Sequence, residues 1–180
     1  IGPVDWILAE NRLAKLNLLG WSWGTVTMAT YTTENASKVN RLVLYAPVWI
    51  RSTPSPVQGV GAYRVVKKDA AYARWINGVP EGKKETLIPK GWFEAWADAT
   101  FKSDPGSLAK FGPDTLRAPN GVIQDGQEFW AAGKAYYDAA KITVPTLLTI
   151  AEWDRDTPTY MAQTLFPLLV NAPMKRLVIL

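Results

Sequence analysis

The chain has 180 residues, of which 48% are hydrophobic and 20% charged, and its net charge is +4. It contains no cysteine and no histidine, which excludes disulfides, a cysteine nucleophile and thiolate metal sites, so we expect no metal and no cofactor. Positive and negative residues are interspersed, and no apolar run approaches the ~18 residues of a membrane-spanning helix. We therefore expect a cytoplasmic globular protein that binds neither nucleic acid nor membranes.

The beginning of the chain alternates between helical and strand patterns. Apolar residues at helical spacing predict a helix over 4–13, and short apolar runs predict strands over 15–19 and 40–46. The segment 24–35 between these strands is ambiguous, because its β-branched residues favour a strand and would make LNLLGWSWGTVTMATYT a β-hairpin. The short distance to the next strand and the tail ENASKVN favour a helix instead. We favour this helix, which makes a strand–helix–strand crossover of a parallel sheet.

The middle of the chain is richer in proline and glycine, and no strand repeats are evident there. Helices are predicted at about 62–77, 89–102 and 125–137. A buried-strand pattern then returns at 142–150, before a helix at about 158–169.

These patterns predict an α/β fold with a mostly parallel sheet. Residues 1–49 and 138–180 form its core, and residues 50–137 form a helical insertion. The final run MKRLVIL predicts a buried strand that no turn residue follows, and no strand precedes the one at 15–19. We therefore expect the sequence to be an internal piece of a larger α/β domain.

The stretch GWSWG places Ser22 between two tryptophans and two glycines, with the spacing G-x-S-x-G. A serine on a sharp strand-to-helix turn projects its hydroxyl above the sheet, and flanking glycines relieve crowding there. The amide of Trp23, at the start of the helix, can donate to a developing oxyanion. Ser22 is therefore a candidate nucleophile, and the alternative is the bend of an aromatic-rich hairpin.

An acidic loop, AEWDRDTP, directly follows the apolar strand that ends at Ile150. If the strands are parallel, Asp154 lies at the same sheet edge as Ser22, where an acid can orient a histidine. The alternative is a solvated loop in which Asp154 or Asp156 caps the helix near Pro158. Both interpretations can hold, with Asp154 as the acid and Asp156 or Thr157 as the cap.

The order of GWSWG, YAPVW, a helical insertion, VPTLLTIAEWDRDTP and RLVIL resembles the second half of an α/β-hydrolase with a helical cap domain. This resemblance covers essentially the whole chain. It implies that Ser22 is the nucleophile, that the Trp23 amide is one oxyanion donor and that Asp154 is the triad acid. It also implies a histidine shortly after Leu180 and a second oxyanion donor upstream of Ile1. The 180-residue piece alone is therefore expected to show no ester hydrolysis above background.

Aromatic residues supply the candidates for a substrate pocket. Trp21, Val48 and Trp49 follow strand ends at the expected active edge, and Trp130 lies in the insertion. They suggest a small apolar or aromatic substrate, although aromatic residues at helical spacing more often pack a core. The sequence does not distinguish whether the cleaved bond belongs to an ester, a thioester, a carbon–carbon bond or a peracid. An alternative function is a non-catalytic α/β-hydrolase-like protein that binds small molecules or partners, and the sequence does not indicate an oligomeric state.

Overall fold

The computed structural model describes residues 2–55 and 59–180. The chain forms two compact units, the first comprising residues 1–55 and 126–180 and the second residues 56–125. Within the described residues, no helix combines the length and the apolar character needed to cross a membrane.

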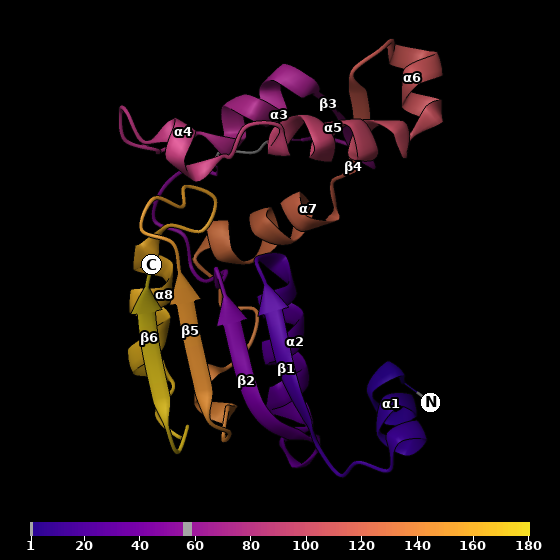
Figure 1. The fold of residues 1–180 in the computed structure, drawn as a ribbon. Helices are drawn as coiled ribbons and strands as arrows, with labels where there is room; N and C mark the ends of the chain where they lie inside the picture. The colour runs from indigo at the N-terminus through magenta and orange to yellow at the C-terminus, as the bar shows by residue number, and fades with distance from the viewer. Residues whose placement is uncertain (1, 56–58) are drawn as a thin grey trace. The chain divides into compact units, whose positions relative to one another are not determined.

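The first unit is built on a four-stranded sheet in the order β1-β2-β5-β6 (Figure 1). The strands are β1 (Leu16–Trp21), β2 (Val39–Tyr45), β5 (Thr146–Ile150) and β6 (Lys175–Ile179). Every neighbouring pair is parallel, with Leu44 opposite both Gly20 of β1 and Leu148 of β5. The predicted α/β fold with a parallel sheet is therefore confirmed.

The helices α2 (Trp23–Glu34) and α8 (Thr159–Leu165) cover one face of the sheet, and α1 (Pro3–Asn11) precedes β1. The first unit also contains the short 3₁₀ segments η1 (Ala36–Lys38), η2 (Trp130–Ala132), η3 (Ala139–Lys141) and η4 (Phe166–Leu168). In Figure 1, α2 runs behind β1 and β2, and α8 runs behind β5 and β6. The crossover by α2 rules out the hairpin alternative, because a tight turn cannot join parallel strands.

The β-branched residues that favoured a strand are accommodated inside α2. The hydroxyl of Thr32 donates to the carbonyl of Met28 at 2.7 Å, and that of Thr33 donates to the carbonyl of Thr30 at 2.7 Å. Such back-bonding satisfies these two hydroxyls within the helix, whereas the buried hydroxyl of Thr30 has no hydrogen-bond partner among the described residues. Burial of one helix face, which includes Val26 and Ala29, then outweighs the local strand preference.

The two faces of the sheet differ in burial. Leu42, Leu44 and Leu148 point to the helical side and are fully buried with Met161 and Leu165 of α8. The opposite face carries apolar residues that are 37% to 66% exposed, namely Leu19, Trp21, Tyr45 and Val178. The expectation that the last strand is buried is wrong, since β6 lies at the edge of the sheet and Ile179 is 45% exposed.

The second unit contains a two-stranded antiparallel sheet, with Val65 opposite Arg117. Its elements are β3 (Tyr63–Lys67), α3 (Lys68–Trp75), α4 (Lys84–Leu87), α5 (Trp92–Lys102), α6 (Pro105–Phe111) and β4 (Thr115–Pro119), and α7 (Gly121–Glu128) crosses the unit boundary. The helix predicted at 62–77 is wrong in its first part, because residues 63–67 form β3 and the helix begins only at Lys68. The helix predicted at 125–137 is also wrong, because α7 starts earlier and ends at Glu128.

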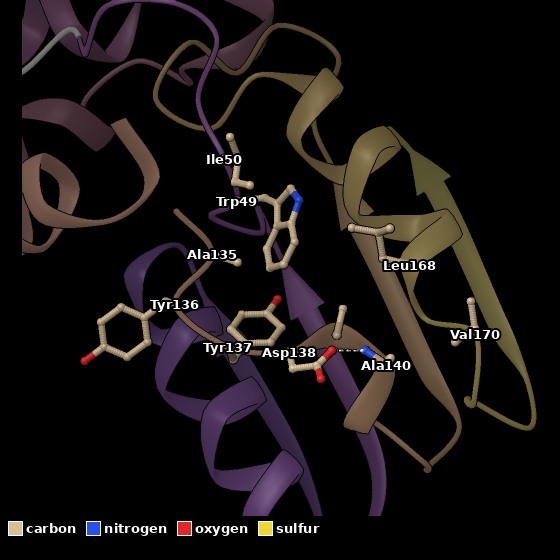
Figure 2. Close-up of a pocket in the computed structure, with 10 residues that line it drawn as sticks. Trp49, Ile50, Ala135, Tyr136, Tyr137, Asp138, Ala140, Leu168 and Val170 are labelled. Carbon is tan, nitrogen blue, oxygen red and sulfur yellow. Dashed lines mark hydrogen bonds between the residues drawn. The ribbon is translucent and has the colours of Figure 1, made fainter. Parts of the chain in front are cut away.

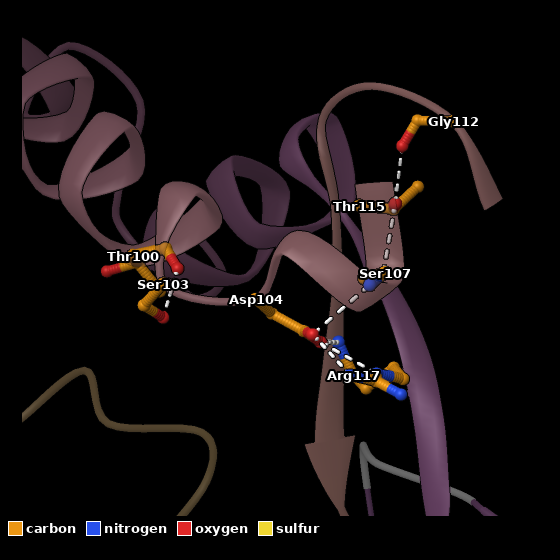
Figure 3. A network of polar contacts seen from close by, with 7 residues as sticks. All are labelled: Thr100, Ser103, Asp104, Ser107, Gly112, Thr115 and Arg117. Atoms are coloured by element: carbon orange, nitrogen blue, oxygen red, sulfur yellow. Dashed lines mark hydrogen bonds and ion pairs between the residues drawn. The ribbon is translucent and has the colours of Figure 1, made fainter. Parts of the chain in front are cut away.

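A small aromatic cluster and a polar network stabilise the second unit. Phe93 and Phe101 are buried with two alanines, and the ring of Phe93 lies 5.3 Å from that of Trp75. Figure 3 shows the network around Asp104, which caps α6 by accepting from the Ser107 amide at 3.1 Å and also accepts from Nε of Arg117 at 2.9 Å. The hydrogen bonds from Arg117 hold the pKa of Asp104 well below its usual value.

Candidate active site

Ser22 lies at the turn between β1 and α2 with φ 52° and ψ −124°. A non-glycine residue rarely adopts positive φ, and such a conformation persists only where the surrounding structure holds it. The Ser22 amide donates to the carbonyl of Tyr45 at 2.9 Å, so the turn is hydrogen-bonded to the end of the neighbouring strand. This is the backbone geometry expected of a nucleophile elbow.

The two glycines of the motif are not equivalent. A Cβ at Gly20 would lie 2.5 Å from the carbonyl oxygen of Gly24 and 2.7 Å from Cα of Thr25. Both are backbone atoms and cannot move without displacing α2. A Cβ at Gly24 would meet nothing within 4 Å. The expectation that both glycines relieve crowding is therefore confirmed for Gly20 and wrong for Gly24.

Thr25 fastens the turn from inside α2 and was not identified from the sequence. Its side chain is fully buried, and its hydroxyl donates to the Ser22 carbonyl at 2.6 Å. The same oxygen accepts from the Val48 amide at 3.0 Å, so one hydroxyl joins the serine turn to the loop after β2. A threonine three residues after the serine does not by itself indicate this role. Its second partner, the Val48 amide, lies too far away in the sequence to form a local pattern.

Trp23 is the first residue of α2, where amide N–H groups point out of the helix. Its amide therefore belongs to the helix terminus beside Ser22. Its side chain is 45% exposed. The N-terminal position of this amide makes it suited to stabilise negative charge that develops next to the serine.

Asp154 lies in the loop between β5 and α8, and its carboxylate is held by that loop. Oδ1 accepts from the amides of Asp156 and Thr157, each at 2.8 Å, and Oδ2 accepts from the hydroxyl of Thr157 at 2.8 Å. The N-cap position of α8 is Pro158, which makes no side-chain capping bond. The Thr157 hydroxyl, expected as a possible cap, bonds to Asp154.

Arg51 connects the loop after β2 to the loop that carries Asp154. Its Nη1 donates to the Asp156 carbonyl at 2.7 Å, and its Nη2 donates to the Arg155 carbonyl at 3.2 Å. The Arg51 amide donates to the carbonyl of Trp130 at 2.8 Å. Sequence reasoning missed Arg51, since its partners lie about a hundred residues away and leave no local signal.

The loops that carry Ser22 and Asp154 leave the same edge of the sheet. Ser22 follows β1 and Asp154 follows β5, with β2 between these parallel strands. Two strand spacings of about 4.8 Å put the starts of these loops about 10 Å apart. At that separation, the acid and the serine can be connected by hydrogen bonds through one further side chain between them.

The family profile described as alpha/beta hydrolase fold matches residues 2–165. The chain belongs to the α/β-hydrolase family. No curated protein matches the chain significantly.

Several solved structures have a fold similar to that of this chain. A serine hydrolase involved in carbazole degradation, CarC, has a TM-score of 0.60 and 18% identity, covering 97% of this chain and 58% of that protein. The meta-cleavage product hydrolase CumD from Pseudomonas fluorescens IP01, complexed with acetates, has a TM-score of 0.61 and 13% identity, covering 98% and 60%. The thioesterase domain from the curacin biosynthetic pathway has a TM-score of 0.58 and 15% identity, covering 98% and 63%. This α/β-hydrolase chain thus spans about three-fifths of their length.

The side chains predicted to line a substrate pocket occupy different environments in this α/β-hydrolase chain. Trp21 is 66% exposed, whereas Val48, Trp49 and Trp130 are 6% to 8% exposed. Trp49 packs against Tyr137 with ring centroids 5.1 Å apart. The buried residues Val48, Trp49 and Trp130 therefore contribute to packing in the first unit.

A pocket of about 650 Å³ lies within the first unit (Figure 2). Trp49 is among its ten lining residues, but Ser22, Trp23 and Asp154 are not. The pocket is therefore formed by a different set of residues from the serine turn and the acidic loop.

Proposed function

We propose that this chain carries the nucleophile and the acid of a serine hydrolase. The observation that carries the proposal is the backbone of Ser22, at φ 52° and ψ −124° between a parallel strand and a helix. Membership of the α/β-hydrolase family supports the same function. A strained serine at a helix N-terminus is suited to present its hydroxyl to a carbonyl carbon.

The proposed reaction proceeds through an acyl-enzyme. Ser22 Oγ attacks the carbonyl carbon while a base takes its proton, and the carbonyl oxygen becomes an oxyanion that accepts a hydrogen bond from the Trp23 amide. The intermediate collapses, the leaving group takes a proton, and water hydrolyses the acyl-enzyme. Asp154 orients the base. Among the described residues, Thr157 is the donor to Oδ2 of Asp154, and a carboxylate oxygen can accept a further hydrogen bond.

We propose that the base is a histidine in a part of the protein outside these 180 residues, since the sequence contains none. The chain covers only 58% and 60% of two similar hydrolase structures, which supports a longer parent protein. The exposed apolar face of the sheet, with Leu19 and Trp21, supports it too, because parallel sheets are usually covered on both faces.

We propose a small apolar or aromatic acyl compound as the substrate. Trp21 and Trp23 flank Ser22 and expose 66% and 45% of their surface, so they offer aromatic contacts beside the nucleophile. Two similar proteins are described as a hydrolase of carbazole degradation and a meta-cleavage product hydrolase, which supports an aromatic substrate. A third is a thioesterase domain, so esters, thioesters and activated carbon–carbon bonds all stay candidates.

Ester hydrolysis tests this proposal in the protein extended to its natural termini. With p-nitrophenyl butyrate, we expect Ser22→Ala to lower kcat by about 10³-fold or more and Asp154→Asn by about 10²-fold or more. The matched control is Ser37→Ala, an exposed serine of η1, which should keep full activity. The 180-residue chain should not exceed background. Turnover that survives Ser22→Ala would refute the nucleophile, and Ser22-dependent turnover by the 180-residue chain would refute an external base.

A second candidate is a non-catalytic protein of the same fold that binds small molecules, and the absence of histidine from these 180 residues supports it only if the whole protein lacks that histidine too. The continuation of the coding sequence distinguishes the two. A histidine within about ten residues after Leu180 supports the enzyme, whereas a continuation without histidine supports the binding protein.

A further inference from the structure

The pocket of about 650 Å³ in the first unit is formed by three segments of the chain. Trp49 and Ile50 come from the loop after β2, residues 135–140 from the segment around η3, and Leu168 and Val170 from the end of η4 and beyond. Figure 2 shows Leu168 and Val170 across from Trp49 and Tyr137, whereas the ring of Tyr136 points away from them. The volume of the pocket lies within the range of about 300–1,000 Å³ that is usual for small-molecule sites.

The pocket has an aromatic floor and an apolar rim. Trp49 and Tyr137 form the floor, each 6% exposed and in ring contact with the other. Leu168 and Val170 form the apolar part of the rim, and they are 45% and 66% exposed. Exposed apolar side chains around a concave surface favour an apolar occupant. The carboxylate of Asp138 also lies at the rim and disfavours an anion.

The hydroxyl of Tyr137 lies buried within this floor and has no hydrogen-bond partner among the described residues. Buried tyrosine hydroxyls normally find a partner, because leaving one unpaired costs free energy. In Figure 2 the hydroxyl points toward the ring of Trp49, inward among the lining residues. Burial raises the pKa of the Tyr137 phenol, so the group stays protonated at neutral pH and can donate a hydrogen bond.

We propose that this pocket is a second binding site, for a small uncharged molecule with an aromatic or apolar body and a carbonyl-type acceptor for the Tyr137 hydroxyl. The site goes beyond the hydrolase function, since Ser22 and Asp154 do not line it. The hydroxyl is closed to solvent in this structure, so the proposed binding requires a lining side chain to rotate and admit the acceptor. The bound carbonyl then supplies the partner that the hydroxyl lacks.

A matched pair of probes tests this proposal. Acetophenone and α-methylstyrene have the same shape, but acetophenone has a carbonyl oxygen where α-methylstyrene has a methylene group. Their dissociation constants are measured by ligand-observed NMR titration of the full chain and of Tyr137→Phe. We expect Tyr137→Phe to weaken acetophenone binding by about three- to tenfold and to leave α-methylstyrene binding unchanged. The melting temperature of Tyr137→Phe should be equal or higher, because the variant removes an unpartnered buried hydroxyl.

Further variants locate the site. Ala135→Phe fills the rim and should abolish binding of both probes, whereas Ala132→Phe, an exposed alanine that is not among the lining residues, should leave it unchanged. Ser22→Ala should also leave it unchanged, which separates this site from the catalytic proposal. Equal weakening of both probes by Tyr137→Phe, absence of binding, or a lower melting temperature that reveals an existing partner of the hydroxyl would each overturn the proposal.

Discussion

The two compact units of this α/β-hydrolase chain are stabilised in different ways. The first unit buries an aliphatic core between one face of a parallel sheet and its helices, with Leu42, Leu44 and Leu148 fully buried. The second has a small aromatic cluster and a polar network in which Asp104 accepts hydrogen bonds from Arg117. A strained backbone such as that of Ser22 needs rigid surroundings. Its position in the unit with the larger core meets that need.

The largest expected effect tests the buried face of the sheet against the exposed one. Leu148 is fully buried, whereas its neighbour Leu147 points to the other face and is half-buried. We expect Leu148→Ala to lower the free energy of unfolding by about 4 kcal/mol and Leu147→Ala by about 1 kcal/mol. Urea unfolding, monitored by amide hydrogen exchange in β2 and β5, measures the loss of unfolding free energy in both variants. Equal losses would mean that the second face is also buried in solution.

The next prediction compares the two glycines that flank the serine. Gly20→Ala places a methyl group against backbone atoms, so we expect a loss of about 3 kcal/mol in unfolding free energy. Gly24→Ala adds a methyl group to open space in the first turn of α2, and we expect a gain of up to about 1 kcal/mol. Both values come from urea denaturation. A similar loss in the two variants would contradict the close approach of α2 to β1 at Gly20.

Strain at the serine itself gives a smaller effect. Relative to Ser22→Ala, we expect Ser22→Gly to raise the free energy of unfolding by about 1 kcal/mol, because glycine tolerates positive φ. At Ser37, whose φ is not positive, glycine should instead be less stable than alanine by about 0.5 kcal/mol. Thermal unfolding of the four variants measures the difference. If glycine fails to stabilise position 22 relative to alanine, the turn is not strained.

The smallest effect concerns pH and the second unit. The pKa of Asp104 is lowered in the folded chain by its hydrogen bonds to Arg117, from the usual carboxyl value of 3.8. The ionised carboxylate therefore contributes stability above pH 3.8 that is lost as the pH falls toward the lower folded value. Asp104→Asn keeps the acceptor for the Ser107 amide and removes the charge, so we expect it to abolish this part of the acid sensitivity.

The loss of the stability that Asp104 contributes is measured by amide hydrogen exchange of β4 and α6 between pH 5 and about 2. The control is Asp98→Asn, because Asp98 is 61% exposed and its ion pairs with Lys68 and Lys102 are long, at 3.7 Å. Exposed pairs of this kind contribute little. Acid sensitivity that is the same in the Asp104 and Asp98 variants would contradict a specific role for Asp104.

The sequence allowed the first unit to be predicted better than the second. Buried parallel strands are recognisable locally, and the strand before Ser22 together with the crossover places the serine at a strand-to-helix turn. The strand β3 was mistaken for helix because its pairing partner β4 is about fifty residues away. Local propensity cannot reveal such a partner.

The contacts around the candidate site were less predictable than its residues. Thr25 and Arg51 act through the Val48 amide and the Asp156 carbonyl, which only the folded chain brings to them. The Asp154 loop follows β5 as predicted, but the hydrogen bond from the Thr157 hydroxyl to Asp154 could not be read from the sequence. Such contacts depend on three-dimensional geometry that a sequence pattern does not contain.

The most direct measurement is covalent labelling of the protein, extended to its natural termini, with a fluorophosphonate probe. Such probes react with activated serines and leave ordinary serine hydroxyls unmodified. Peptide mass spectrometry should locate the label on Ser22, with labelling lost in Ser22→Ala and kept in Ser37→Ala. Labelling that persists in Ser22→Ala, or a protein with no label at all, would contradict the account of Ser22 as a nucleophile.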